Sequence, residues 1–233
     1  MYIANDNNAS GTMGFGTMTK NGDKYENLTS LWDQGGITAV KVHPETGAVF
    51  IGYHSGSWIY QYDGTNFIPK FQLPDAAGAA ASKGNINTIA FDKQGTTAYI
   101  VSRKNHVIYK ASYDMATGEF NDVKLLAGSF GVTGYADGTG TSAKFNEPSQ
   151  GDVDEDGNFY VADRGNHCIR VITPDGEVST YAGQNKAGMV DGIASLAEFN
   201  NPEGCQFGPD GALYVADYSN HAIRKVEDGP AQP

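Results

Sequence analysis

The sequence reads FNEPSQGDVDEDGNFYVADRGNHCIRVITPDGEVSTYAG at residues 145–183 and FNNPEGCQFGPDGALYVADYSNHAIRKVEDG at residues 199–229. The two stretches align without a gap, and Asp163 of the first corresponds to Asp217 of the second, 54 positions later (217 − 163). A unit that recurs in register is one supersecondary element, which cannot bury its apolar face alone and must stack on its neighbours. The repeat therefore predicts a stack of equivalent units.

Three weaker copies of the unit precede these two. Each unit contains a strand-like run around an aromatic residue, and these aromatic residues follow one another at intervals of 48, 49, 61 and 54 positions. They are Tyr2, Phe50, Tyr99, Tyr160 and Tyr214. We therefore expect one domain over residues 1–229, a tail over 230–233, and five units over 1–34 (partial), 35–73, 84–128, 145–183 and 199–229 (partial).

The composition favours strands and tight turns over helices, with 30 Gly, 13 Tyr and 11 Phe against 18% charged residues. The formal net charge of −11 opposes binding to nucleic acid or to anionic lipid, because both require a basic surface. No apolar run is long enough to span a membrane, and the first residues lack the pattern of a signal peptide. We expect a monomer with no nucleic-acid partner and no insertion into a membrane, and the chain itself does not specify a compartment.

Turn signals divide each unit into four strand-like runs. In the fourth unit, Asp156-Gly157 and Pro174-Asp175-Gly176 separate such runs, and glycine accepts the positive φ that these turns require. Four antiparallel strands repeated around an axis form a β-propeller blade. Glycine-rich segments at 128–145 and 183–199 are interpreted as structural connections between successive blades. The sequence therefore predicts an all-β propeller of four-stranded antiparallel blades, five of which lie in this chain.

The pattern FNxPxG…DGNxYVADxxNHxIRxI, read over residues 128–229, resembles the NHL repeat. This resemblance implies a propeller that usually has six blades, so five units imply an open or incomplete ring. It also implies that the chain is the C-terminal portion of a longer bacterial protein that is exported or lies at the cell surface.

One set of polar residues recurs at the same place in successive units. Symmetry spreads such positions around a ring, whereas a metal site needs side chains that converge on one ion, so we interpret the set as structural and predict no metal site. We expect its aspartates to cap the amides of their own turn, its asparagines to adopt the tight-turn conformation and its imidazoles to bind nearby backbone. The set is Asp163, Asn166, His167, Asp217, Asn220, His221, Asn105 and His106.

Two further patterns have structural interpretations. Asp152, Asp154 and Asp156 are spaced as in a calcium loop, but Asp163 lies beyond a strand, roughly 20 Å away, so we assign the pattern to a repeat turn. Cys168 and Cys205 fall in strands that are not expected to be neighbours, and we expect both to be unpaired and buried.

Positions that differ between units are the candidates for ligand recognition. One group of aligned positions lies at the start of the first strand of each unit, near the channel mouth, and includes Asn87, Ser149, Gln150 and Glu203. A second group lies in the turn between the second and third strands. Arginine offers a planar fork and aromatic rings can stack, which suits a protein or glycan ligand. The selected residues are Asn87, Arg103, Gln150, Arg164, Glu203, Tyr218 and His54.

Two hypotheses of function follow from these residues. The first is a non-catalytic recognition or scaffold propeller that binds a protein or carbohydrate through its loop-rich face and needs no cofactor. It is favoured because no nucleophile–base set can be assigned in the sequence, so no catalytic residue is predicted. The alternative is a metal-dependent hydrolase or lyase with calcium or zinc in the central channel, for which the channel mouth offers a single carboxylate, Glu203.

Overall fold

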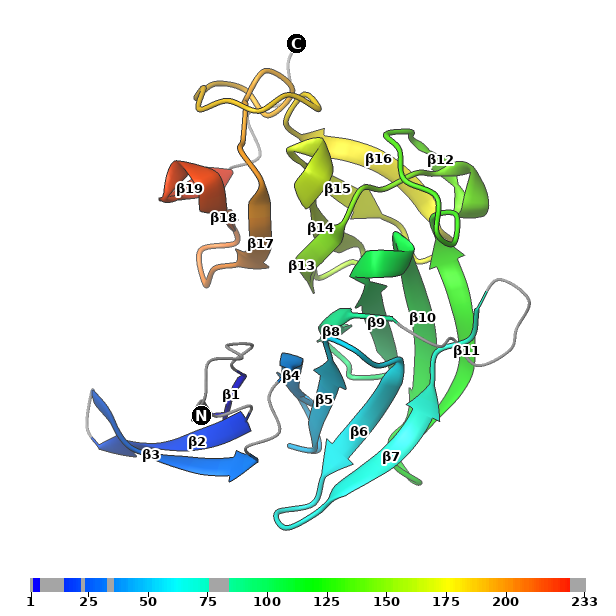
Figure 1. Ribbon diagram of the computed structural model, residues 1–233, viewed down its shortest axis with the longest axis vertical. Helices are drawn as coiled ribbons and strands as arrows, with labels where there is room; N and C mark the ends of the chain where they lie inside the picture. Colours follow the sequence, from blue (N-terminus) through cyan, green and yellow to red (C-terminus); the bar gives the residue numbers. More distant parts are fainter. Residues whose placement is uncertain (1, 5–14, 22–23, 33–35, 76–83, 227–233) are drawn as a thin grey trace.

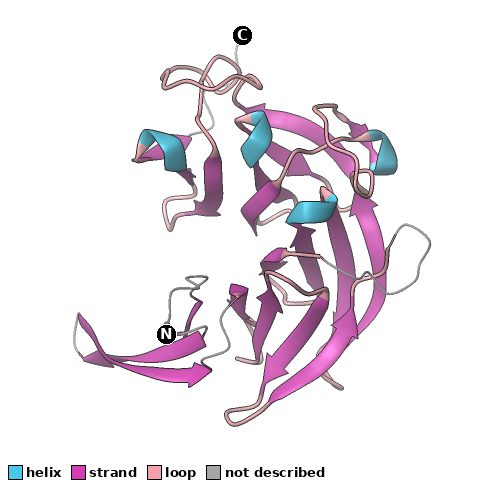
Figure 2. Ribbon diagram, in the orientation of Figure 1, coloured by secondary structure: helices cyan, strands magenta, loops and turns pink. Residues whose placement is uncertain are grey.

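The computed structural model describes residues 2–4, 15–21, 24–32, 36–75 and 84–226. The secondary structure in these residues consists of strands and four short 3₁₀ turns, drawn in cyan in Figure 2. No helix in the described ranges has the length and apolarity needed to cross a bilayer.

The strands form five antiparallel sheets, each built from segments that are close in sequence. The first sheet contains β1 (Tyr2–Ala4), β2 (Phe15–Asn21) and β3 (Lys24–Trp32). The second contains β4 (Ile37–Val42), β5 (Val49–Tyr53), β6 (Trp58–Tyr62) and β7 (Phe67–Gln72). The third contains β8 (Ile86–Phe91), β9 (Thr97–Ser102), β10 (Val107–Asp114) and β11 (Glu119–Ala127).

The last two sheets come from the strong repeats. The fourth sheet contains β13 (Pro148–Val153), β14 (Phe159–Asp163), β15 (Cys168–Ile172) and β16 (Glu177–Ala182). It also includes β12 (Gly138–Thr139), which pairs with β16 and was not predicted. The fifth sheet contains β17 (Pro202–Phe207), β18 (Leu213–Asp217) and β19 (Ala222–Val226).

The five sheets are arranged around a common centre as the blades of a propeller (Figure 1). Their innermost strands contact one another in chain order, β1 with β4, β4 with β8, β8 with β13 and β13 with β17. The predicted all-β propeller of antiparallel blades is therefore confirmed. Strands β4, β8, β13 and β17 line the channel side by side, and we call the end at which these four strands start the channel mouth.

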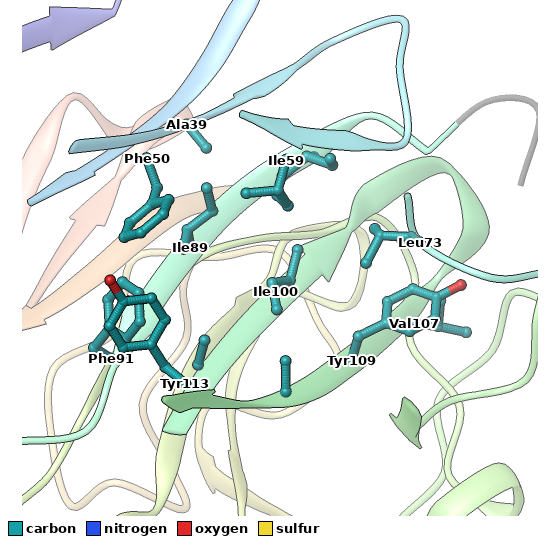
Figure 3. Packing of buried hydrophobic residues seen from close by; sticks show 13 residues of the cluster. Ala39, Phe50, Ile59, Leu73, Ile89, Phe91, Ile100, Val107, Tyr109 and Tyr113 are labelled. Carbon is teal, nitrogen blue, oxygen red and sulfur yellow. The ribbon is translucent and has the colours of Figure 1, made fainter. Parts of the chain in front are cut away.

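Apolar side chains between neighbouring blades form the core. Figure 3 shows Phe50 and Ile59 of the second blade packed with Ile89 and Ile100 of the third. Between the third and fourth blades, the ring of Tyr99 stacks on that of Phe159 at 5.2 Å between centroids. The Tyr99 hydroxyl donates a hydrogen bond to the Gly157 carbonyl oxygen at 2.7 Å. The blades are thus joined by apolar burial, which stabilises by about 25 cal/mol for each Å² removed from water.

The turn between the second and third strands contains a residue in the left-handed conformation, and this residue is histidine. The short turns η1 (Arg103–Asn105), η3 (Arg164–Asn166) and η4 (Tyr218–Asn220) end at His106, His167 and His221, whose φ angles are 56°, 55° and 52°. The prediction that asparagine takes this conformation is wrong. Asn166 instead lies within η3, one residue before the left-handed position. Its Nδ2 donates hydrogen bonds to the Gly134 carbonyl oxygen and to Asp163 Oδ2.

Cys168 and Cys205 are buried and unpaired, as predicted. Cys168 begins β15, and Cys205 lies in β17 of the next blade. Burial raises the pKa of both thiols well above the ordinary range, which keeps them protonated. The two cysteines therefore behave as small core residues rather than as nucleophiles.

Candidate functional site

The repeated aspartate joins the start of its blade to the turn that follows it. Asp163 Oδ1 accepts a hydrogen bond from the backbone N–H of Asn146 at 2.8 Å, and Asp217 Oδ1 accepts one from that of Asn200 at 2.7 Å. The prediction that these aspartates cap their own turns is wrong, because no side-chain cap bond forms in η3 or η4. The amides that they bind lie 17 residues earlier in the chain.

A buried arginine completes this arrangement. Arg170 has no exposed side-chain surface, and its Nη1 donates to Asp163 Oδ2 at 3.0 Å. Its Nη2 reaches back to the preceding connection, where it binds the Ala136 carbonyl oxygen and Asp137 Oδ1. Arg224 makes the same set of bonds in the fifth blade. The two arginines were not predicted to have a role, although their recurrence in the IR pair of each strong repeat was a visible signal.

The repeated histidines link one blade to the next. His106 Nδ1 accepts a hydrogen bond from the backbone N–H of Glu147 at 3.0 Å, and His167 Nδ1 accepts one from that of Asn201 at 3.1 Å. The imidazoles thus bind backbone, and the backbone belongs to the following unit. Burial lowers the pKa of His106 and of His167, which favours the neutral ring that these bonds require.

The Asp152–Asp156 segment forms a turn at the opposite end of the channel. Asp154 Oδ1 accepts hydrogen bonds from the backbone N–H groups of Asp156 and Asn158. Asp163 lies at the far end of β14, beside the channel mouth. Within the described residues, no three His, Cys, Asp or Glu side chains form a group that could hold a metal ion.

At the channel mouth, side chains from three blades meet in an ionic network. Glu203 of the fifth blade accepts hydrogen bonds from Arg103 Nη1 at 2.7 Å and from Arg164 Nε at 2.8 Å. Glu147 contacts the same two guanidinium groups, at 3.5 Å from Arg103 Nη2 and 3.1 Å from Arg164 Nη1. We call these four residues the mouth network. Each of its two positive charges lies between two negative charges, so the network is neutral as a whole.

Neutral polar groups extend the mouth network toward the channel. Ser149 Oγ donates to Glu203 Oε1 at 2.9 Å and accepts from Asn87 Nδ2 at 2.7 Å. Thr88 Oγ1 donates to the Ser149 carbonyl oxygen at 3.2 Å. Asn87, Thr88 and Ser149 are buried, so this chain of hydrogen bonds fixes the position of the Glu203 carboxylate.

The structure thus brings together four of the seven residues selected as ligand-binding candidates, Asn87, Arg103, Arg164 and Glu203. Gln150 is exposed and lines the channel just below them. His54 and Tyr218 occupy the turns of the second and fifth blades that correspond to those of Arg103 and Arg164, and Tyr218 is 60% exposed. That these residues bind a ligand remains a prediction.

Glu147 is the member of the mouth network that was not predicted. It stands at a position before the first strand that takes positive φ, and Asn85, Glu147 and Asn201 occupy that position with φ of 48°, 53° and 50°. A charged residue is unusual where asparagine otherwise accepts the left-handed backbone, and this departure from the repeat was the available signal.

Below the mouth network the channel holds a cavity of about 520 Å³. Strands β4, β8, β13 and β17 line it, together with Tyr214 and Ala216 of β18 and Ile223 of β19. Its polar lining near the mouth includes Thr38, Asn87, Thr88 and Gln150. At its deeper end, Lys41 Nζ lies 3.8 Å from Asp152 Oδ1. A cavity of this size can accept a small molecule or one or two sugar rings, and its walls offer mostly uncharged hydroxyl and amide groups near the mouth.

The sequence model of the NHL repeat matches residues 145–172, the segment that runs from the last residues before β13 through β15. The "NHL repeat-containing protein 2" of Bos taurus is 33% identical over 105 residues, which are 45% of this chain and 14% of that protein. "Protein SUPPRESSOR OF QUENCHING 1, chloroplastic" of Arabidopsis thaliana is 35% identical over 138 residues, 56% of this chain and 13% of that protein. The chain therefore spans only a small part of these relatives.

Solved structures match over nearly the whole chain. An auxiliary nutrient binding protein from Bacteroides thetaiotaomicron superposes with a TM-score of 0.84 at 29% identity, over 96% of this chain and 55% of that chain. A virginiamycin B lyase from Staphylococcus aureus has a TM-score of 0.56 at 16% identity, over 84% of this chain and 54% of that chain, and this likeness shows the fold alone. The chain is therefore a β-propeller that contains an NHL repeat at residues 145–172 and is similar in sequence to NHL repeat-containing proteins.

Proposed function

We propose that the chain is a recognition module without catalytic activity, which binds a saccharide at the channel mouth. The observation that carries the proposal is the cavity of about 520 Å³ below the mouth network, which is lined by polar side chains from several blades. Gln150 is exposed there, whereas the hydroxyl groups of Thr38 and Thr88 donate hydrogen bonds within the protein and offer their oxygens as acceptors. Sugars are recognised by such neutral hydrogen-bonding groups, and each hydroxyl can both donate and accept. The similar Bacteroides structure is described as a nutrient binding protein, which supports a binding role.

The alternative of a metal-dependent hydrolase or lyase has less support from the geometry. Glu203 is the carboxylate that was expected to serve a metal, but both of its oxygens accept hydrogen bonds from arginine. A protein ligand also fits less well, because the centre of a protein interface is usually apolar and aromatic, whereas the mouth is charged and polar.

The test is calorimetric titration of the purified chain with a panel of neutral oligosaccharides, in EDTA and again with calcium or zinc. We expect saturable binding in EDTA that is weakened in Gln150→Ala, since Gln150 is an exposed group on the cavity wall. The matched control is Lys93→Gln, which breaks the exposed Lys93–Glu155 pair near the opposite end of the channel. Binding that requires a metal, or that is lost equally in both variants, would contradict the proposal.

A further inference from the structure

The mouth network has two carboxylates that hold the same pair of arginines in different ways. Glu203 uses both oxygens, at 2.7 and 2.8 Å, and its Oε1 also accepts from Ser149 Oγ. Glu147 uses Oε2 for both guanidinium groups, at 3.1 and 3.5 Å. The Glu203 side chain is 33% exposed and that of Glu147 is 48% exposed. Glu203 is therefore the fixed inner partner, and Glu147 is the weaker outer partner.

The inner contacts hold the two guanidinium groups in a fixed orientation. Arg103 and Arg164 keep only 18% and 26% of their side-chain surface exposed, so little side-chain entropy is left to lose when another group binds. Glu147 contacts Arg103 Nη2 and Arg164 Nη1, two nitrogens that Glu203 does not contact. A carboxylate that replaced Glu147 would meet two preorganised guanidinium groups and would take over the contacts that Glu147 gives up.

Displacement of Glu147 does not require its backbone to move. Its N–H is held by His106 Nδ1 at 3.0 Å, and its φ of 53° is fixed by the turn that leads into β13. The side chain alone can rotate toward water, where an exposed carboxylate is well solvated. Exposed ion pairs contribute little, so a ligand that gains further contacts at the channel mouth can compete with this one.

We propose that the ligand is a saccharide with one carboxylate, a uronic acid, and that this carboxylate displaces Glu147 from Arg103 and Arg164. The inference rests on saccharide binding at the channel mouth and adds the charge of the sugar. A single carboxylate suits the site better than a polyanion, because the chain carries a formal net charge of −11 and repels dense negative charge.

The test compares two sugars that differ only in the group at C6, 4-nitrophenyl β-D-glucuronide and 4-nitrophenyl β-D-glucoside. Calorimetry of the wild-type chain is expected to show tighter binding of the glucuronide. Glu147→Gln removes the internal competitor and is expected to raise affinity for the glucuronide about tenfold, with no change for the glucoside. Arg164→Gln is expected to remove the preference for the glucuronide.

The matched control is Glu155→Gln, which makes the same change in an exposed carboxylate that pairs with Lys93 near the opposite end of the channel. It is expected to leave both affinities unchanged. Equal affinity for the two sugars in wild type and Glu147→Gln would overturn the uronic acid and leave saccharide binding intact. Acetate that binds as tightly as the glucuronide would show that the arginines take a bare carboxylate, which also overturns the inference. If neither sugar nor any neutral oligosaccharide binds, the proposed function itself is wrong.

Discussion

At the scale of single residues, Arg170 is a fully buried charge that joins the fourth blade to the connection before it. It binds Asp163, and neither side chain has exposed surface. Removing one partner of a buried ion pair leaves the other charge without compensation, which typically costs about 3 to 5 kcal/mol. We therefore expect Arg170→Met to lower the free energy of unfolding by that amount, measured by urea denaturation followed by tryptophan fluorescence.

The control for this prediction is Arg164→Met, the same substitution six positions earlier. The Arg164 side chain is 26% exposed and its partners are partly hydrated, so the loss should stay below about 1 kcal/mol. Equal losses in the two variants would mean that the buried pair adds nothing beyond a partly exposed one.

At the scale of the turn, the repeated histidine couples blade contacts to pH. Burial lowers the pKa of His106 and His167, and each neutral ring accepts a backbone hydrogen bond. Since the folded pKa is below the unfolded value of about 6.5, the unfolded chain binds more protons as the pH falls. The stabilisation is therefore complete above pH 6.5 and is lost on acidification.

The corresponding prediction is that the melting temperature of the wild type falls between pH 7 and pH 5, and that His106→Asn/His167→Asn reduces this fall. Asparagine tolerates the left-handed backbone of these positions but does not titrate. Because the comparison is between two proteins at each pH, ionisation of the carboxylates affects both. Identical slopes for the two proteins would show that the histidines do not contribute.

The same turn shows which elements the sequence can predict. The strands follow from local signals, since Asp156-Gly157 and Pro174-Asp175-Gly176 mark the ends of hairpins that the structure contains. The contacts of Asp163 and His167 do not follow from local signals, because their partners lie 17 and 34 residues away and belong to other strands or to the next blade. Strand β12 was missed for a related reason, since a two-residue strand is defined only by its partner β16.

The candidate site was predictable to a similar degree. Alignment of the units showed that Arg103, Arg164 and Glu203 break the repeat, and the ring geometry brings these three together. The pairing itself spans 100 and 39 positions in the chain, so its partners could not be read from spacing. Only the placement of whole blades around one channel decides which side chains meet there.

At the scale of the whole molecule, stability depends on how each blade packs against the next. Tyr99 lies at the interface between the third and fourth blades. Its ring packs on Phe159 of the following blade, and its hydroxyl donates to the Gly157 carbonyl oxygen. Burial raises the pKa of Tyr99 to about 12, with smaller contributions from nearby aspartates. The folded pKa is thus above the unfolded value of about 10, so this stabilisation is complete below pH 10 and is lost as the pH rises toward 12.

We therefore expect alkaline denaturation to be shallower in Tyr99→Phe than in the wild type between pH 10 and 12, because the variant lacks the ionisable hydroxyl at this blade interface. At pH 7 the same variant should be less stable by about 1 kcal/mol, the usual net value of one hydrogen bond. Unfolding by urea at each pH measures both effects, and Tyr62→Phe serves as the control because its hydroxyl binds Gly64 within its own blade. If the two variants follow the same pH dependence, ionisation of Tyr99 at the blade interface is not what weakens the ring.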